Sequence, residues 1–409
     1  MVVKSGGIYL QDGWDVTVAR NPGDIEALRP VWEQMQAKEP YPVLNADIDR
    51  FLSVIEASDG SLQPYIVLIK QNDRPVAMVL ARIGENSVEL KLGYKTLLSP
   101  KLRCLTVVYG GILGQPEEEL CIFLIEKLME MLRRGEVGII YFNHLRTNSQ
   151  LYNFARNMPG LLDKSYLPRI QSHWQTHIPE NVESFYERIP SKHKREWRRC
   201  ERRLAKECEG PVEVLCYRKE SEIDQIMKVA YDISARSYKH AMNIGIADDV
   251  RTRALLSQAA RNGSLRAYIL YVNKVPCAFE FGVHYRETFF AEYMGYDRAW
   301  SSFGPGALLW VKVIEDLCTD TAINTLDYGF GDAPYKQRLG TKVWQEAPVY
   351  IFAPRPYPIF INMVRTFTMG LNRGLEYILN KIGLTGWIKR RWRDLLQVRS
   401  VEKKHRVGR

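Results

Sequence analysis

The sequence repeats one order of strands and helices, and this repeat limits the fold more than any other feature. Pro64–Ile83 and Arg266–Tyr285 each hold two strand-length apolar runs around a polar turn, with a Tyr early in the first run and a Pro leading into the second. Each hairpin is followed by a strand, a glycine-rich turn, a helix and another strand. In the first half these are Leu105–Val108, Gly110 with Gly111 and Gly114, Glu117–Arg133 and Val137–Phe142; in the second half they are Thr288–Met294, Gly304 with Gly306, Ala307–Cys318 and Thr325–Tyr328.

Each half also opens with a strand followed by a helix, so the repeat predicts two α/β domains of like topology. A chain of 409 residues is long enough to bury two cores of ordinary size. The expected domains are residues 1–178 and 179–355, followed by a basic helical tail at 356–409.

Cysteine usage and hydropathy exclude several classes of protein. The seven cysteines form no C-x-x-C pair and no zinc-type spacing, which predicts a reduced compartment and no metal site. The N-terminal segment lacks the apolar region of a signal peptide, and no apolar run approaches the roughly 18 residues that a spanning helix needs. We therefore expect a cytoplasmic protein.

A glycine turn in the second half is the strongest functional signal. The stretch "WSSFGPGALLW", Trp300–Trp310, passes from a predicted strand into an apolar helix. The N–H groups at a helix start, together with the helix dipole, bind phosphate well. The alternative is a plain tight turn that only starts the helix. The predicted phosphate cradle consists of Ser301, Ser302, Phe303, Gly304, Gly306 and Ala307.

Further motifs follow this turn in a fixed order: "FGPGALL" at Phe303–Leu309, "LDYGFGDAPYKQRLG" at Leu326–Gly340, and "APVYIFA" as a closing strand. Together they resemble the GNAT-superfamily acetyltransferase domain of CelD-type cellulose-biosynthesis proteins, in a tandem layout similar to that of the FemAB peptidyltransferases. The segment "YERIPSKHKREWRRCERRLA" at Tyr186–Ala205 also resembles this family, so the resemblance spans about 40% of the chain, from Phe185 to Ala353.

The resemblance implies two α/β (α+β) acyltransferase domains with mixed, splayed sheets. It also implies that the glycine turn holds the pyrophosphate of acetyl-CoA or a longer acyl-CoA, with pantetheine along the strand Ala291–Met294, so that Tyr293 and Met294 join the cofactor-binding residues. The first half serves as an internal control. Its helix begins Pro116-Glu117-Glu118-Glu119, and carboxylates there would repel a pyrophosphate, so we expect only the second half to bind the cofactor.

Amine acylation needs a base, donors near the thioester oxygen and an acid for the thiolate. Asp332 is a predicted catalytic or substrate-orienting carboxylate, with a helix N-cap or a turn carboxylate as the alternative. Tyr335 is the candidate thiolate acid or a residue that lines the acceptor pocket, and Lys336 is the candidate for binding an anionic substrate group. Glu292 is a third catalytic candidate, because a carboxylate on a central strand is costly unless it is hydrogen-bonded or useful.

Other polar residues of the second half have weaker patterns. Glu280 and His284 share a strand face, where they form either a substrate-binding base relay or part of an exposed sheet face. Asp327 is predicted to be a structural acid at a strand end. Because no nucleophile elbow or Cys-His arrangement is present, we expect direct transfer without a covalent intermediate.

Positive charge is concentrated in two segments. Residues 187–206 hold nine Lys and Arg against three acids, and residues 355–409 hold 13 against three, a net +10 that equals the net charge of the chain. Helix Ser191–Lys206 should pack through a stripe of His193, Trp197, Cys200 and Leu204. Its positive face is either simply solvated or a dock for an anionic acceptor or the phosphates of CoA.

The tail is predicted to form helices at Ile359–Ile382 and Thr385–Val398. The second carries Trp387 and Trp392 on an apolar face opposite several Lys and Arg. We expect residues 384–409 either to contact an anionic membrane surface or to pack on a domain.

Together these observations predict an acyl-CoA N-acyltransferase whose acceptor is a primary amine on a sugar, amino acid or cell-envelope or polysaccharide precursor. Two alternatives stay open: a FemAB-like transferase that uses aminoacyl-tRNA, and a non-catalytic scaffold of a polysaccharide assembly. The uneven charge does not indicate a general nucleic-acid-binding platform.

Overall fold

The computed structural model describes residues 8–11, 13–41, 43–93, 95–207, 209–237 and 245–382. Within this part, the chain divides into two compact units. The first comprises the residues up to Gln171 together with Trp344–Ile382, and the second comprises Ser172–Val343. This division differs from the expected boundary at 178/179, because each unit takes a strand from beyond its own half of the sequence.

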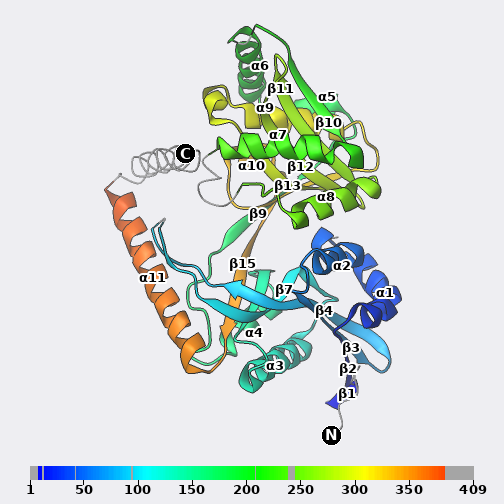
Figure 1. The fold of residues 1–409 in the computed structure, drawn as a ribbon, viewed down its shortest axis with the longest axis vertical. Helices are drawn as coiled ribbons and strands as arrows, with labels where there is room; N and C mark the ends of the chain where they lie inside the picture. Colours follow the sequence, from blue (N-terminus) through cyan, green and yellow to red (C-terminus); the bar gives the residue numbers. More distant parts are fainter. Residues whose placement is uncertain are drawn as a thin grey trace, which may run out of the picture. The chain divides into compact units, whose positions relative to one another are not determined.

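The sheet of the first unit has the strand order β1-β2-β3-β4-β7-β8-β15 (Figure 1). All neighbours are antiparallel except β7 and β8, which are parallel. A separate pair, β5 with β6, extends from this unit. The strands are β1 (Ile8–Gln11), β2 (Trp14–Ala19), β3 (Gln63–Gln71), β4 (Arg74–Ser87), β5 (Leu90–Leu92), β6 (Lys95–Leu98), β7 (Lys101–Leu113), β8 (Ile139–Arg146) and β15 (Lys342–Phe352).

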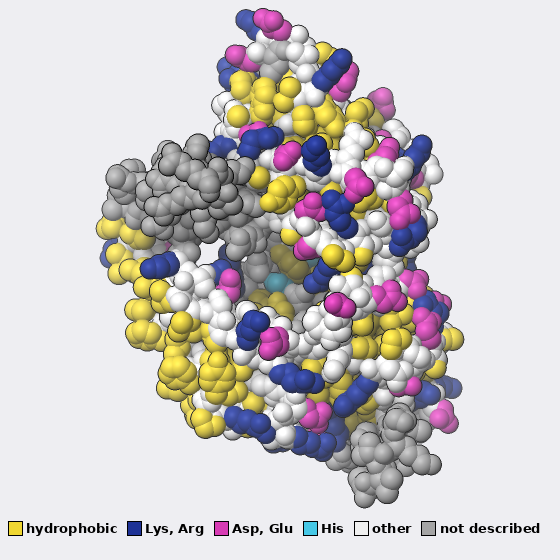
Figure 2. Space-filling model, viewed as in Figure 1, with side chains coloured by type: hydrophobic (Ala, Val, Ile, Leu, Met, Phe, Trp, Pro, Cys, Tyr) yellow, Lys and Arg dark blue, Asp and Glu magenta, His cyan; other side chains and the backbone are white. Residues whose placement is uncertain are grey.

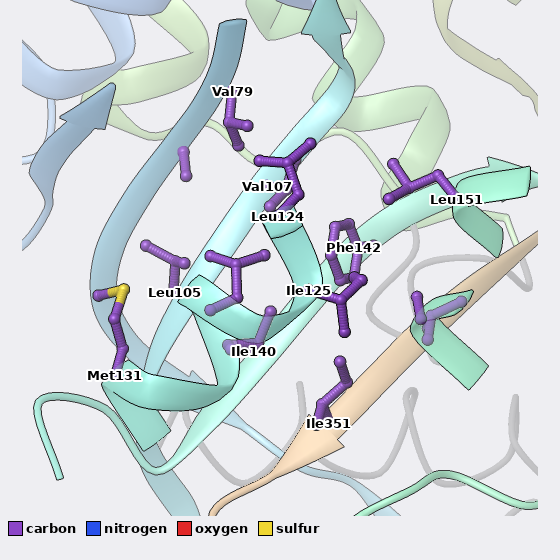
Figure 3. Packing of buried hydrophobic residues seen from close by; sticks show 14 of the residues in the cluster. Val79, Leu105, Val107, Leu124, Ile125, Met131, Ile140, Phe142, Leu151 and Ile351 are labelled. Carbon is purple, nitrogen blue, oxygen red and sulfur yellow. The ribbon is translucent and has the colours of Figure 1, made fainter. Parts of the chain in front are cut away.

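Helices cover both faces of this sheet, and the alternation of side chains along β4 shows why. Ala77 and Val79 face the helices α3 and α4, whereas Met78 and Leu80 face α1 and α2. Figure 3 shows the first of these cores, where Leu124 and Ile125 of α3 meet strand residues such as Val107 and Phe142. The helices are α1 (Pro22–Ala37), α2 (Ile48–Glu56), α3 (Glu118–Arg134), α4 (Gln150–Asn157) and α11 (Pro356–Lys381), with a 3-10 turn η1 (Leu44–Ala46).

The sheet of the second unit repeats this topology with the order β10-β11-β12-β13-β14-β9. Again one central pair, β13 with β14, is parallel and the other neighbours are antiparallel. The tandem α/β repeat expected from the sequence is therefore confirmed. The strands are β9 (Gln171–His177), β10 (Val212–Tyr217), β11 (Leu265–Val272), β12 (Val275–Tyr285), β13 (Thr288–Tyr296) and β14 (Thr325–Phe330).

Two groups of helices cover the second sheet. Helices α5, α6 and α9 share a core with alternate strand residues such as Tyr268, Phe289 and Leu326. Helix α7 contacts β12 and β13, and helix α8 contacts β11. The helices are α5 (Val182–Arg188), α6 (Ser191–Glu207), α7 (Ile223–Ala235), α8 (Val250–Arg261), α9 (Pro305–Leu317) and α10 (Pro334–Leu339), with the 3-10 turns η2 (Glu220–Glu222) and η4 (Arg298–Phe303).

The last strand of each sheet comes from an unexpected part of the sequence. The segment "APVYIFA" was expected to close the second domain, but it belongs to β15, which pairs antiparallel with β8 of the first unit. The corresponding edge of the second unit is formed by β9, which precedes the expected boundary and pairs with β14. The expectation for the closing strand was therefore wrong.

Two tail helices were expected. The first, Ile359–Ile382, corresponds to α11, which the structure assigns to the first unit. The second, Thr385–Val398, lies outside the described residues. In the part of the chain that the structure describes, no helix has the length and hydropathy required to cross a membrane.

Candidate active site

The centre of the second unit contains a fork between two parallel strands. Strands β13 and β14 pair only over Thr288–Phe290 and Thr325–Asp327. Past these residues β13 continues to Tyr296 alongside β12, and β14 continues to Phe330 alongside β9. The splayed sheet expected from the resemblance is therefore present, and the edge of β13 from Ala291 to Met294 faces away from β12 without pairing to β14.

Helix α9 begins beside the far end of β13. Its N-cap, Gly304, has φ +66°, a left-handed conformation that favours glycine. No side chain caps the first turn, and that turn contains no acid. A Cβ added to Gly306 would lie 3.3 Å from Tyr296 and 4.0 Å from Met294, so position 306 faces the end of β13. The turn thus offers N–H donors and a positive helix end next to the free strand edge.

The basic helix α6 packs against this turn. As expected, Trp197 and Leu204 of its apolar stripe are buried in the core shared with α9. The Sγ atom of Cys200 would lie 3.7 Å from a Cβ on Gly304. The guanidinium of Arg203 lies 4.9 Å from the centre of the Phe303 ring. A cationic side chain therefore stands beside the predicted phosphate cradle.

The bases of α6 are left uncompensated by their own helix. Glu196 pairs with Arg338, and Glu201 pairs with Lys312, so these acids are used by cations of other elements. Within the described chain, none of the eight Lys and Arg side chains of α6 forms a salt bridge. These eight are Lys192, Lys194, Arg195, Arg198, Arg199, Arg202, Arg203 and Lys206.

Tyr335 reaches the free edge of β13 from α10. Its hydroxyl donates to Sδ of Met294 at 3.1 Å. Its ring stacks on Trp310 at 5.5 Å and meets Tyr328 edge-on at 5.9 Å. This aromatic cluster fixes the phenol at the fork, so two residues predicted for different roles, Tyr335 and Met294, are brought together.

Glu280 lies behind the fork rather than on an open sheet face. It is 1% exposed, and its backbone partner on β13 is Met294. Burial raises the pKa of Tyr328 far above its usual value, an effect that hydrogen bonding with Thr176 opposes and the nearby charge of Glu280 reinforces. The exposed-face alternative is thus wrong for Glu280, and its role as a substrate-binding residue stays a prediction.

Glu292 occupies an irregular position on β13. Phe281 of β12 pairs with Tyr293, and the next residue, Gly282, pairs with Ala291, so Glu292 is the extra residue of a β-bulge. Bulges re-aim side chains and are frequent next to active sites. Its catalytic role was predicted from the sequence, and the bulge supplies a local reason for a half-buried carboxylate on this strand.

Asp332, which follows β14, has structural partners that the sequence did not indicate. Asp332 accepts hydrogen bonds from Trp174 Nε1 at 2.9 Å and Ser172 Oγ at 3.3 Å, and the N-cap of α10 is Ala333. The N-cap alternative for Asp332 was therefore wrong. Its exposed carboxylate is oriented by β9, and a catalytic or substrate-orienting role stays a prediction.

Lys336 does not point its charge at an open site. It is 5% exposed, and its Nζ donates to the carbonyl oxygens of Tyr328, Gly329 and Phe330 at 2.8, 3.2 and 2.7 Å. Three acceptors use all three N–H bonds of an ammonium. We therefore correct the expected substrate-binding role: Lys336 holds the end of β14 in its diverging course.

His284 and Glu280 do not form the expected relay at the fork. The backbone partner of His284 is Phe289, which lies where β13 and β14 are still paired. His284 therefore lies before the point where the two strands separate, and its substrate-binding role has no support in the geometry.

A buried histidine that the sequence did not single out lies at the fork. His173 Nε2 is 2.8 Å from Asp327 Oδ1, and Gln175 donates to the other carboxylate oxygen at 2.9 Å. The structural role expected for Asp327 agrees with these contacts. His173 was missed because β9 precedes the expected domain boundary, 154 residues from its partner.

The corresponding fork of the first unit differs in its chemistry. Strands β7 and β8 diverge after Val107 and Phe142. Beyond them, Glu346 accepts from Trp344 Nε1 at 2.6 Å and from the Tyr109 hydroxyl at 3.4 Å. The guanidinium of Arg146 covers the rings of Tyr41 and Trp344. The first turn of α3 carries the carboxylates of Glu118 and Glu119.

These side chains and carboxylates are consistent with the expectation that the first unit binds no acyl-CoA, which stays a prediction. Among the described residues, no group of three or more His, Cys, Asp or Glu side chains is arranged to hold a metal ion.

Residues 191–337 match the family model described as an acetyltransferase (GNAT) domain. Residues 191–337 of the second unit therefore resemble a GNAT acetyltransferase domain. This assignment supports an acyltransferase, and it includes the glycine turn, the fork and Tyr335. No curated protein sequence matches the chain.

The tandem fold has similar solved structures. The crystal structure of FemX aligns with a TM-score of 0.54 at 10% identity, covering 81% of this chain and 98% of FemX. A tandem GNAT protein from the clavulanic acid biosynthesis pathway covers 83% of this chain and 99% of its own, with a TM-score of 0.48 at 10% identity. At these identities the FemX likeness shows a shared fold across both units.

Proposed function

We propose that the GNAT domain transfers an acyl group from acyl-CoA to a primary amine. The observation that carries this proposal is the uncapped, acid-free start of α9 at the left-handed Gly304, beside the free edge of β13. The residues fit the donor: the first turn of α9 would hold the pyrophosphate, Arg203 would add a cation, and the edge from Ala291 to Met294 would take pantetheine.

Acyl-CoA would supply the activated acyl group as a thioester. Attack by the amine forms a C–N bond, the C–S bond breaks, and the amine loses a proton. Tyr335 is placed to protonate the departing thiolate, because its phenol already reaches the free edge of β13. Glu292 and Asp332 are the carboxylates proposed to bind or deprotonate the ammonium. The acceptor would be an amino sugar, an amino acid or a cell-envelope or polysaccharide precursor, as the CelD-type resemblance suggests.

Thermal unfolding of the full-length protein with acetyl-CoA, a long-chain acyl-CoA and desulfo-CoA tests the donor. Binding to the native state raises the unfolding temperature in a saturable manner. We expect such a shift for at least one thioester, and none for Gly306→Trp, whose side chain would fill the space next to Tyr296 and Met294. Gly374→Trp, at a position with open space on α11, is the matched control. Equal shifts in Gly306→Trp and wild type would refute the cradle.

A second candidate, transfer from aminoacyl-tRNA, is favoured by one observation. The eight Lys and Arg side chains of α6 form no salt bridge within the described chain. A row of unpaired positive charges along a helix suits a polyanion longer than CoA. If RNA is the donor, binding of bulk tRNA should weaken steeply with salt, and Arg195→Gln with Arg199→Gln should reduce the slope by about two. A salt-independent or unchanged affinity would reject this candidate. Absence of both CoA and tRNA binding would leave the non-catalytic scaffold.

A further inference from the structure

Helix α11 is amphipathic, but its larger apolar face is exposed rather than buried against its own unit. A series of large apolar side chains spaced by three or four residues is exposed along one side, and Phe360 and Phe367 are 61% and 67% exposed. At 100° per residue the series lies within an arc of about 120°, in which no charged side chain interrupts it before Lys381. This α11 face consists of Tyr357, Phe360, Met363, Phe367, Leu371, Leu375, Ile378 and Ile382.

The side of α11 that meets the first unit combines a small apolar contact, Ile361 and Val364 beside Phe352, with several polar anchors. Asn362 is 2% exposed and donates to the carbonyl oxygens of Leu162 and Lys164, both at 2.9 Å. Arg365 donates to Ser165 Oγ at 2.7 Å. Asn372 donates to the carbonyl oxygen of Lys91 at 2.8 Å. A helix fixed in this way does not need its larger apolar side for attachment to its own unit.

The segments bound by these polar anchors expose apolar side chains of their own. Figure 2 shows apolar side chains gathered along the side on which Figure 1 draws α11. Monomeric proteins seldom expose contiguous apolar surface of this extent unless it meets a partner or a membrane. The neighbouring exposed residues are Leu92, Leu97, Leu98, Leu161, Leu162, Tyr166 and Ile170.

The charge of this part of the sequence selects among partners. Helix α11 contains three bases and one acid, and the 27 residues that follow Ile382 contain nine bases and two acids. An apolar helix face rich in Phe, Tyr and Leu, next to a cluster of Lys and Arg, has the composition of a helix that binds in the plane of an anionic bilayer. A protein partner would have to match both a broad aliphatic face and an excess of about nine positive charges.

We propose that the α11 face binds an anionic lipid surface, with the aromatic and aliphatic side chains entering the headgroup region. This inference is separate from the proposed function, because none of these residues belongs to the donor site. It places the first unit in the role of a membrane adaptor for an enzyme whose catalytic residues lie in the second.

Co-sedimentation of the full-length protein with vesicles tests the proposal. The two lipid compositions are pure phosphatidylcholine and phosphatidylcholine with 30% phosphatidylglycerol. We expect binding to the anionic vesicles, and a partition coefficient at least tenfold lower for the double variant Phe360→Glu with Phe367→Glu. The matched control is Val250→Glu with Val275→Glu, at exposed positions of the second unit, which should bind like wild type. Thermal unfolding of each variant checks its folding.

Equal binding by wild type and the Phe360/Phe367 variant would overturn the proposal. So would a wild type that binds neither vesicle. In that case sedimentation equilibrium distinguishes the other occupants: a dimer that the Phe360/Phe367 variant dissociates indicates a second copy, and an unchanged monomer indicates coverage by residues 383–409. Because acyl-CoA binding is measured separately, failure here leaves the proposed function unaffected.

Discussion

Lys336→Met is expected to lower the free energy of unfolding of the second unit by about 3 kcal/mol or more. The substitution keeps the length of the buried side chain but removes the ammonium that donates to three carbonyl oxygens at the end of β14. Each buried acceptor left without a donor costs about 1–3 kcal/mol. Denaturant unfolding followed by tryptophan fluorescence measures the loss as a lower midpoint.

Arg338→Met is the matched control, since Arg338 lies on the same helix and loses the same kind of charge. Its partner Glu196 is about half exposed, and a surface ion pair contributes between 0 and about 1 kcal/mol. Similar losses in the two variants would contradict the assignment of Lys336 as the residue that holds β14 apart from β13. We also expect Lys336→Met to weaken donor binding, because the fork depends on the position of β14.

Tyr335→Phe is expected to reduce the turnover number for acyl transfer about 100-fold while leaving the affinity for acyl-CoA nearly unchanged. The ring keeps its stacking on Trp310, and only the hydroxyl that lies at Met294 is lost. Removal of a positioned general acid costs about two to four orders of magnitude in rate. Release of free thiol from acyl-CoA in the presence of amino sugars and amino acids measures the rate, and thermal shift measures the affinity.

Tyr328→Phe provides the control for this second experiment. Its hydroxyl accepts from Thr176 Oγ1 in the core behind the fork, so its loss should cost about 1 kcal/mol of stability and little turnover. If Tyr335→Phe retains the wild-type rate, the phenol is not the thiolate acid. If Tyr328→Phe loses as much rate as Tyr335→Phe, the aromatic cluster acts through packing rather than proton transfer.

The repeat could be predicted from the sequence because hairpins and helix starts depend on local sequence signals. The hairpins at Pro64–Ile83 and Arg266–Tyr285 and the helix that follows Gly304 all lie close to their expected positions. The sheets that β9 and β15 join could not be predicted from the sequence. A strand's apolar alternation states that one face is buried but carries no information about which distant edge it joins.

The candidate site divides in the same way. Gly304, Gly306, Met294 and Tyr335 were predicted from motifs, and the structure gathers them around one fork. Lys336 was misread because a buried lysine bound to backbone carbonyls has no sequence signature. His173 was missed because its partner Asp327 lies across the boundary that the repeat suggested.

The exchange of β9 and β15 sets an order of events during synthesis. β8, at the growing edge of the first sheet, leaves the ribosome long before β15, its antiparallel partner. The whole second unit, Ser172–Val343, is made in the interval. An unpaired strand edge invites association with other chains, and domains otherwise fold as they emerge. The first unit is thus the earlier to begin folding and the later to finish, so a chain truncated anywhere before Trp344 carries an incomplete first sheet.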